Sequence, residues 1–524
     1  SNSYPDVTRQ IRQLMNTGAL VMNYSGHGAA TSISHEKVVD VTDFANAVSS
    51  HLPLWVAATC DIMPFDGQTE NIGETALLNP HGGAIAFYGT TRTVFQSYNR
   101  LMNQTFMRHL LNISDGRPMP IGEAVRRAKN ELITTGGDLT ANKLQFVLLG
   151  DPALRLSLPV RKVLIDSING VALTDTNRPI PLSAGTTVKV CGHVQQGEGA
   201  DPAFNGQITA TVCDAAETVV CRRNDSSQAQ KAFVYTDHTH TLFTGSDSIR
   251  QGVFSFSFTV PRDISYSDAI GLLHVYAVNT DRTQTANGHC TRFTLGGTDA
   301  NTDDNEGPEV YCYLNSSDFV DGGRVNPTPY FIAELEDASG INAAGNGLGH
   351  NLTLVIDGQT TQTYNLNDYF AYDFGSHTRG TVGFSIPQLT AGDHHLMFRA
   401  WDMQNNVTTR ELNFRVVEGL APGVFEVETT RNPATTTTGF RIIHDRVGTA
   451  LDISIEVFDM AGRMLWQHRQ QATPSDRSLT IDWDLSASNG HRLSTGVYLY
   501  RVRLGSTGGQ QVSKTKKLIV LSNK

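Results

Sequence analysis

The chain has 524 residues, with 41 Lys and Arg against 51 Asp and Glu and a formal net charge of −10. This length exceeds what one hydrophobic core can organise, so we expect several domains. The mild acidity and the lack of a basic stripe argue against nucleic acid or an anionic membrane surface as a partner. No apolar run approaches the roughly 20 residues that span a bilayer, and the initial SNSYPDVTRQ lacks a signal-peptide pattern, so we expect membrane association only through a partner.

Residues 1–158 alternate between helix and strand patterns. Amphipathic segments predict helices, and uninterrupted apolar segments predict strands. Apolar strands separated by helices are typical of a parallel sheet that is covered on both faces. The predicted helices are 7–18 (ended by Gly18), 41–50, 73–79, 97–113 and 120–133 (with Pro120 at its first position), and the predicted strands are 19–24, 52–59 and 82–89.

The composition changes after LLGDPALRLSLPV at 148–160. The following sequence is rich in Thr, Val, Asp, Asn and Gly, and its alternating apolar residues predict β-sandwiches. We expect three immunoglobulin-like sandwiches, over residues 159–300, 305–420 and 424–524, with a polar linker at 296–310. The sequence therefore predicts a multidomain protein, with one α/β part followed by three β domains.

Cysteines and acidic residues give weaker predictions. The six cysteines, at 60, 191, 213, 221, 290 and 312, form no CxxC pair and no zinc pattern. Cys213 and Cys221 would fit either a local disulfide or two free thiols. In the linker, Asp303, Asp304 and Glu306 would fit either a calcium site or a solvated acidic loop, and no cofactor is predicted.

Two motifs place a polar residue directly after an apolar strand. NYSGHGA at 23–29 presents His27, and WVAATCD at 55–61 presents Cys60. Carboxyl ends of parallel strands meet at one rim of a sheet, where an imidazole could convert a cysteine to the reactive thiolate. Glycines beside His27 would let a peptide carbonyl come close, and the N–H groups of Gly28 and Cys60 could hold an oxyanion.

Other interpretations apply to these motifs and their neighbours. Taken singly, a cysteine at a strand end is more often a small buried residue, and GHG is more often a turn. His35 and Glu36 would either line the same cleft or lie in a solvated loop. Asp61 and Asp66 would either recognise a basic or polar substrate group or form turns. His81 in NPHGG is interpreted as part of a helix-to-strand turn.

The motifs GHG and AATC, whose His27 and Cys60 are 33 positions apart, precede a Gly-Gly apolar strand and the closing LLGDPALRL. Together they resemble the gingipain-like family of caspase-fold cysteine peptidases over roughly the first 158 residues. The resemblance implies a dyad of His27 and Cys60, with oxyanion donors at Gly28 and Cys60. In that family an upstream acid orients the histidine, and no segment here matches it. We therefore expect this chain to begin inside a catalytic domain whose missing N-terminal half carries that acid.

Motifs in residues 424–524, among them VFDMAGRMLWQ and STGVYLYRVRL, resemble the C-terminal sorting domains of type IX secretion cargo. A plain immunoglobulin-like domain is the alternative. The middle block is more similar to the sortases of that system than to secreted gingipains.

The sortase resemblance implies an enzyme on the outer-membrane surface, held there by a PorV-like β-barrel partner. Such an enzyme cleaves sorting domains from cargo and attaches the cargo to anionic lipopolysaccharide through a Cys60 thioester. A secreted gingipain-type endopeptidase and a catalytically inactive surface adhesin or scaffold remain alternatives.

Overall fold

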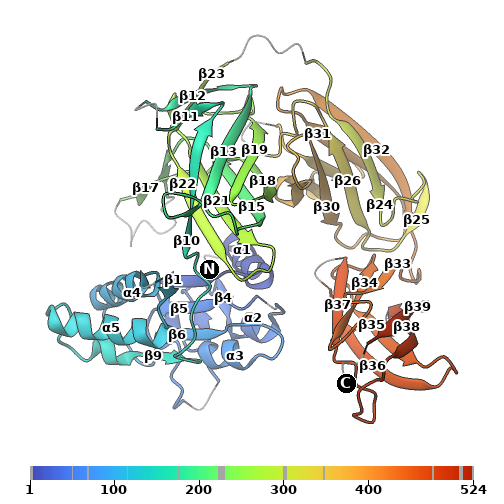
Figure 1. The fold of residues 1–524 in the computed structure, drawn as a ribbon, viewed down its shortest axis with the longest axis horizontal. Coiled ribbons are helices and arrows are strands. Elements are labelled where there is room, and N and C mark those ends of the chain that lie inside the picture. The colour runs from blue at the N-terminus through green and yellow to red at the C-terminus, as the bar shows by residue number, and fades with distance from the viewer. Residues whose placement is uncertain are drawn as a thin grey trace. The chain divides into compact units, whose positions relative to one another are not determined.

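A computed structural model describes residues 4–49, 51–67, 70–114, 116–174, 178–221, 231–298, 304–345, 349–474, 477–506 and 511–521. The chain divides into two compact units (Figure 1). The first comprises residues 1–162, 220–234 and 281–286, and the second comprises residues 163–219, 235–280 and 287–524. The α/β part lies in the first unit, and nearly all the β-rich sequence lies in the second.

The α/β part is built on a four-stranded sheet in the order β1-β5-β6-β9. Strands β1 (Val21–Ser25), β5 (Leu54–Ala58) and β6 (Ala86–Thr90) are parallel, as the sequence predicts. Strand β9 (Phe146–Leu149) pairs antiparallel with β6. The expected parallel sheet therefore carries one antiparallel edge strand, because the apolar run FVLL does not encode a direction.

Helices cover both faces of this sheet. Phe106 of α4 and Ala128 of α5 join one core with Val56 and Tyr88, whereas residues of α1, α2 and α3 join another core with Trp55 and Phe87. The prediction that the sheet is buried on both sides is confirmed. The helices are α1 (Pro5–Thr17), α2 (Val41–Asn46), α3 (Ile72–Leu78), α4 (Gln96–Leu110) and α5 (Ile121–Thr134).

Helix ends follow from capping chemistry. Gly18 caps α1 with a φ of 102°, a conformation that favours glycine. Capping boxes start α2 at Asp40 and α3 at Asn71. Pro120 is the N-cap of α5, one position before the first helical residue, which corrects the predicted place by one position.

Short elements complete the α/β part. Three two-residue strands form a small sheet directly after β1, and a further hairpin and one turn of 3-10 helix follow α4 and α5. These elements are β2 (Gly28–Ala29), β3 (Ser32–Ile33), β4 (Val39–Asp40), β7 (Ile113–Ser114), β8 (Arg117–Pro118) and η1 (Asn142–Gln145).

The first β block is mostly one large sheet. Nine strands join in it, with the main path β14-β13-β10-β22-β21-β15-β18, while β12-β23-β20 and β16-β17 form small separate sheets. Its strands are β10 (Arg161–Ile168), β11 (Val171–Ala172), β12 (Ile180–Ala184), β13 (Thr187–Gln196), β14 (Gly199–Ala200), β15 (Gly206–Cys213), β16 (Glu217–Val220), β17 (Val234–Asp237), β18 (Thr241–Ile249), β19 (Val253–Thr259), β20 (Ala269–Ile270), β21 (Leu272–Asn279), β22 (Thr285–Cys290) and β23 (Phe293–Thr298).

The second block has two sheets, β24-β26-β30-β29 and β25-β32-β31-β27-β28. Phe331 from one sheet and Phe398 from the other share one core, as in a sandwich. Its elements are β24 (Glu309–Leu314), β25 (Gly323–Val325), β26 (Tyr330–Glu336), β27 (Thr353–Ile356), η2 (Thr360–Gln362), β28 (Thr363–Asn365), η3 (Asn367–Tyr369), β29 (Phe370–Tyr372), β30 (Arg379–Ser385), β31 (Gly392–Trp401) and β32 (Val407–Val416).

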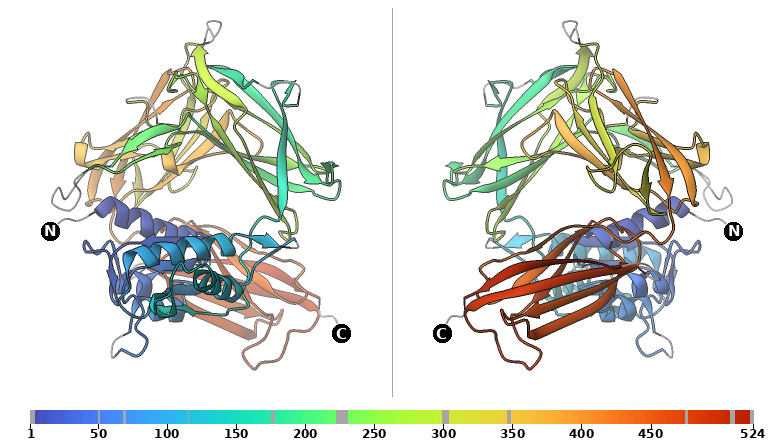
Figure 2. Two further views of the ribbon diagram at one scale, coloured as in Figure 1. Left: turned by 90° about the vertical axis from the view of Figure 1, so that its left-hand side faces the viewer. Right: turned by 90° about the vertical axis from the view of Figure 1, so that its right-hand side faces the viewer.

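The last block, drawn in orange to red in Figures 1 and 2, also has two sheets, β33-β34-β37 and β36-β35-β38-β39. Phe440 and Tyr500 meet in the core between them. Its strands are β33 (Val424–Thr429), β34 (Thr438–His444), β35 (Leu451–Phe458), β36 (Met464–Ala472), β37 (Ser478–Trp483), β38 (Gly496–Ser506) and β39 (Gln511–Val520). The chain is therefore mostly β and multidomain, whereas the immunoglobulin-like assignment stays a prediction.

All six cysteines lie in the described part of the chain and are free thiols. Cys213 is buried and Cys221 is exposed, so the structure has two free thiols where the sequence left a disulfide open. Among the described residues, no helix has the length and apolar character needed to cross a bilayer.

Candidate active site

His27 and Cys60 lie at matching positions beyond two adjacent parallel strands. The last paired residues of β1 and β5 are Ser25 and Ala58, so each candidate follows its strand by two residues. The N–H of Gly26 donates to the carbonyl of Ala58 at 3.4 Å, which carries the pairing one step further. The chain therefore brings both residues to the same rim of the sheet.

The two glycines beside His27 allow close packing of this rim. A Cβ on Gly26 would lie 2.4 Å from the hydroxyl oxygen of Tyr24, and a Cβ on Gly28 would lie 2.6 Å from Oγ1 of Thr59. Distances this short are steric clashes, so a side chain at either position would displace the loop. The loop that carries His27 therefore packs directly against the residue before Cys60.

Cys60 is half-buried and faces the segment that follows β6. Its thiol donates to the carbonyl of Val94 at 3.4 Å, and the neighbouring N–H of Asp61 donates to the carbonyl of Arg92 at 3.2 Å. In the described part of the chain, no backbone carbonyl accepts the N–H of Cys60. That N–H is therefore available to a ligand, as the predicted oxyanion role requires.

The second predicted oxyanion donor, Gly28, lies in β2. Ser34 donates its N–H to the carbonyl of His27 at 2.9 Å, and Gly28 pairs with Ile33. In an antiparallel ladder, hydrogen-bonded and non-hydrogen-bonded pairs alternate, so this pattern points the N–H of Gly28 away from β3.

His27 is exposed, and its ring contacts the ring of His35. The two centroids are 5.3 Å apart in an edge-to-face arrangement. His35 therefore lies beside the predicted base. Glu36 lines a cavity of about 560 Å³ beside α1, together with Arg9 and Arg12.

The acidic residues after Cys60 contact the segment that follows β6. Asp61 has a φ of 45° and accepts a hydrogen bond from Thr93 at 2.7 Å. Asp66 is exposed and forms a two-contact ion pair with Arg92, which lowers the pKa of Asp66. His81 lies in the turn after α3, and its N–H donates to Asn79 at 2.9 Å.

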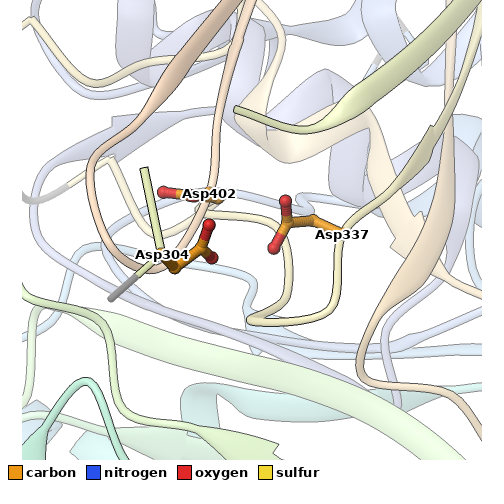
Figure 3. A group of neighbouring side chains, drawn as sticks. All are labelled: Asp304, Asp337 and Asp402. Atoms are coloured by element: carbon orange, nitrogen blue, oxygen red, sulfur yellow. The ribbon is translucent and has the colours of Figure 1, made fainter. Parts of the chain in front are cut away.

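The two acidic residues of the predicted linker that the structure describes, Asp304 and Glu306, do not lie together in one site. Asp304 lies beside Asp337 and Asp402, with one carboxylate oxygen of each within 4.8 Å of the others (Figure 3). Glu306 is exposed outside this cluster, and Asp303 lies outside the described residues. Carboxylate oxygens are the ligands that calcium takes, and exposed acidic groups also gather in this way without an ion.

Sequence reasoning missed Tyr24 and the segment that packs on Cys60. Tyr24 has the pattern of an ordinary strand residue, and only Gly26, two positions further on, signals that a side chain lies close to the backbone. Arg92 and Val94 are more than 30 positions from Cys60, and no motif connects them to it.

Comparison with known proteins gives a family match for the first part of the chain. Residues 1–157 match peptidase family C25. No curated protein sequence matches the chain. The chain is similar to dimeric latent PorU from Porphyromonas gingivalis, with 32% identity over 84% of this chain and 41% of that chain and a TM-score of 0.38. It thus spans about two fifths of the PorU structure.

Two gingipain structures are also similar to this chain. The complex of the pro- and mature domains of RgpB from P. gingivalis matches with 15% identity over 55% of this chain and 57% of that one, with a TM-score of 0.28. Gingipain R (RgpB) matches with 16% identity over 56% of each chain, with a TM-score of 0.26. By the family match, residues 1–157 belong to a gingipain-like cysteine peptidase of family C25, and the chain as a whole is similar to PorU at 32% identity.

Proposed function

We propose that this protein is a cell-surface cysteine peptidase and transpeptidase that acts on proteins carrying C-terminal sorting domains. The observation that carries the proposal is the placement of His27 and Cys60 at matching positions just beyond the ends of adjacent parallel strands. The family match over residues 1–157 supports the peptidase chemistry, and the similarity to PorU supports the substrate class.

In this mechanism His27 takes the proton of Cys60, and the thiolate attacks the peptide carbonyl before the sorting domain. The N–H groups of Gly28 and Cys60 bind the oxyanion. The C–N bond then breaks, His27 protonates the departing amine, and a thioester forms on Cys60. Water would release a free acid, whereas an amine of the acceptor would take the acyl group as a new amide. In the proposal the acceptor is anionic lipopolysaccharide.

The proposed location is the outer surface of the outer membrane, held through a PorV-like β-barrel partner. An N-terminal half of the same catalytic domain, with the acid that orients His27, belongs to the proposed assembly. The contacts of Cys60 described above are all made by residues of this chain, without the β-barrel partner or the N-terminal half.

The linker before the last β domain favours a sortase over a secreted gingipain-type endopeptidase. Arg446 is buried and donates to the carbonyls of Leu420 and Ala421 at 2.8 and 2.9 Å. Gly423 donates to Asp445 at 2.8 Å. A backbone held by the following domain resists proteases, so this domain fits a retained part of the protein better than a label that is removed.

The test is Cys60→Ala in cells that secrete sorting-domain cargo, with Cys221→Ala as the control because Cys221 is exposed and far from Cys60 in sequence. We expect cargo to keep its sorting domain and lose its anchor in Cys60→Ala cells, and normal processing in control cells. Normal processing in Cys60→Ala cells would refute the proposal.

A surface adhesin or scaffold with an inactive catalytic part is the alternative from another class. A thiolate beside an imidazole reacts quickly with iodoacetamide, whereas an inert thiol does not. We expect Cys60 to be alkylated faster than Cys221 in the full protein, as measured by peptide mass spectrometry. Equal or slower alkylation of Cys60 would favour the adhesin.

A further inference from the structure

Tyr24 reaches from the edge strand β1 to the backbone of the candidate base. It lies in β1, three residues before His27, and its half-buried ring packs against the core formed with α1, α2 and α3. Its hydroxyl donates to the carbonyl of His27 at 2.7 Å. Burial, and then the negative charge of Glu36, raise the pKa of Tyr24, so its hydroxyl remains a proton donor at neutral pH.

The carbonyl of His27 therefore accepts two hydrogen bonds. The first comes from Tyr24 at 2.7 Å, and the second comes from the N–H of Ser34 at 2.9 Å. The carbonyl belongs to the peptide unit that joins His27 to Gly28. A trans peptide is planar, so its C=O and N–H point in opposite directions. Fixing the carbonyl of His27 therefore also fixes the direction of the N–H of Gly28.

The glycine at 26 is part of the same arrangement. A Cβ at this position would lie 2.4 Å from the hydroxyl oxygen of Tyr24 and 2.8 Å from its Cζ. The phenol thus occupies the space that a side chain at position 26 would need. Its position is set by packing on both sides, which makes the hydrogen bond to His27 a rigid contact.

We infer that Tyr24 is a positioning residue, whose hydroxyl orients the His27–Gly28 peptide so that the N–H of Gly28 can stabilise the oxyanion. The inference rests on the proposed function, since it concerns the same acyl transfer. Tyr24 touches neither substrate nor the reacting atoms in this arrangement. It acts through the peptide plane, and its effect should therefore appear where an oxyanion forms.

Two reactions of Cys60 distinguish a positioning role of Tyr24 from general disruption of the active site. Cleavage of a peptide bond passes through a tetrahedral oxyanion, whereas alkylation by iodoacetamide is a displacement in which the sulfur expels iodide and no oxyanion forms. The variant is Tyr24→Phe in the full-length protein. The substrate is a recombinant protein with a C-terminal sorting domain, and cleavage is followed by intact mass.

We expect Tyr24→Phe to lower the turnover number about 10-fold with KM unchanged, because one of two bonds that fix the peptide is lost. Alkylation of Cys60 should stay within about 2-fold of the wild-type rate. Tyr98→Phe is the control, because Tyr98 is also half-buried and its hydroxyl makes no hydrogen bond among the described residues. The control should cleave at the wild-type rate.

Wild-type cleavage by Tyr24→Phe would overturn the inference and leave the proposed function intact. A parallel fall in cleavage and alkylation would also overturn it, since that pattern indicates damage to Cys60 or His27. If the wild-type protein shows neither cleavage nor rapid alkylation, the proposed function itself fails. His27→Ala gives the reference for a lost base and should slow both reactions.

Discussion

Gly28 and Thr59 meet at the contact between the His27 loop and the Cys60 strand. A Cβ on Gly28 would lie 2.6 Å from Oγ1 and 3.0 Å from Cγ2 of Thr59. The backbone at Gly28 has an ordinary φ, so the requirement for glycine is steric and not conformational. Thr59 is buried, and its hydroxyl has no hydrogen-bond partner in the described part of the chain.

Gly28→Ala should therefore push the His27 loop away from Cys60. Overpacking of this kind costs about 1–3 kcal/mol of folding stability. Because the displaced loop carries the proposed base and an oxyanion donor, we also expect the cleavage rate to fall roughly 10-fold or more. Adding Thr59→Ala removes both clashing atoms and should restore most of the rate. Gly199→Ala, where no atom lies within 4 Å of the added Cβ, is the control. A double variant as slow as Gly28→Ala would show that the steric explanation is wrong.

The cluster of Asp304, Asp337 and Asp402 predicts how the stability of its domain depends on pH. Burial raises the pKa of Asp402 to about 6, and burial together with the charge of Asp304 raises the pKa of Asp337. Both folded values lie above the unfolded value, so the folded state binds more protons. Stability therefore falls as the pH rises from about 4 to about 6, and it stays at the lower level above that range.

Asp337→Asn removes one of the like charges and keeps an oxygen for the N–H and hydroxyl of Ser339, which Asp337 accepts at 2.7 Å each. We expect it to raise the Tm of the second sandwich by about 2 to 4 °C at pH 7.5 and to have little effect at pH 4.5. The exposed Asp318 in the same domain gives the control, Asp318→Asn. A lower Tm at pH 7.5 would mean that a bound cation compensates these carboxylates.

At the scale of elements, the linker at 418–423 is fixed by the domain that follows it. Arg446 forms an ion pair with Asp445 at 2.6 Å, with side-chain exposures of 3% and 6%. Burial raises the pKa of Asp445 and lowers that of Arg446. Since the pair is shielded from water, removing one partner leaves a buried charge and costs about 3–5 kcal/mol.

Arg446→Met should therefore free the linker and destabilise the last domain. We expect thermolysin to cut residues 418–423 at least about 10-fold faster in this variant, because the carbonyls of Leu420 and Ala421 lose their donors. Arg463→Met is the matched control, since the pair of Arg463 with Asp459 is 79% exposed on the arginine side. Equal cleavage in the two variants would contradict the assignment of Arg446.

The sequence predicts the helices and strands of the α/β part better than it predicts which distant segments pack against one another. Apolar strands and amphipathic helices are local patterns, and each predicted helix and strand of the α/β part is present. The fourth strand, β9, was not among the predicted strands, and its direction depends on a distant partner, because the same apolar run suits either orientation. The cluster of Asp304, Asp337 and Asp402 joins three loops that are 33 to 98 positions apart. Tyr24 was missed because a phenol in a half-buried strand usually only packs, and its partner is a backbone atom.

At the scale of the whole molecule, the sortase and the secreted endopeptidase lead to different expectations for the last domain. A secreted gingipain-type enzyme would lose its sorting domain, as other cargo does. The sortase would remove that domain from others and keep its own. In this chain the last domain has a complete core of its own, and the linker before it is held by buried side chains. We therefore expect the mature protein to retain its last domain, residues 424–524.

Intact mass of the mature protein from cells measures this directly. We expect the mass to include residues 424–524 in the wild type and in Cys60→Ala alike, because a protected linker is a poor substrate for the protein's own site and for other copies of it. Cargo from the same cells gives the internal control and should lose its sorting domain only where Cys60 is present. If wild-type protein ends near residue 420 while Cys60→Ala keeps the last domain, this chain processes itself. Cargo that matures normally in both strains would then favour the endopeptidase.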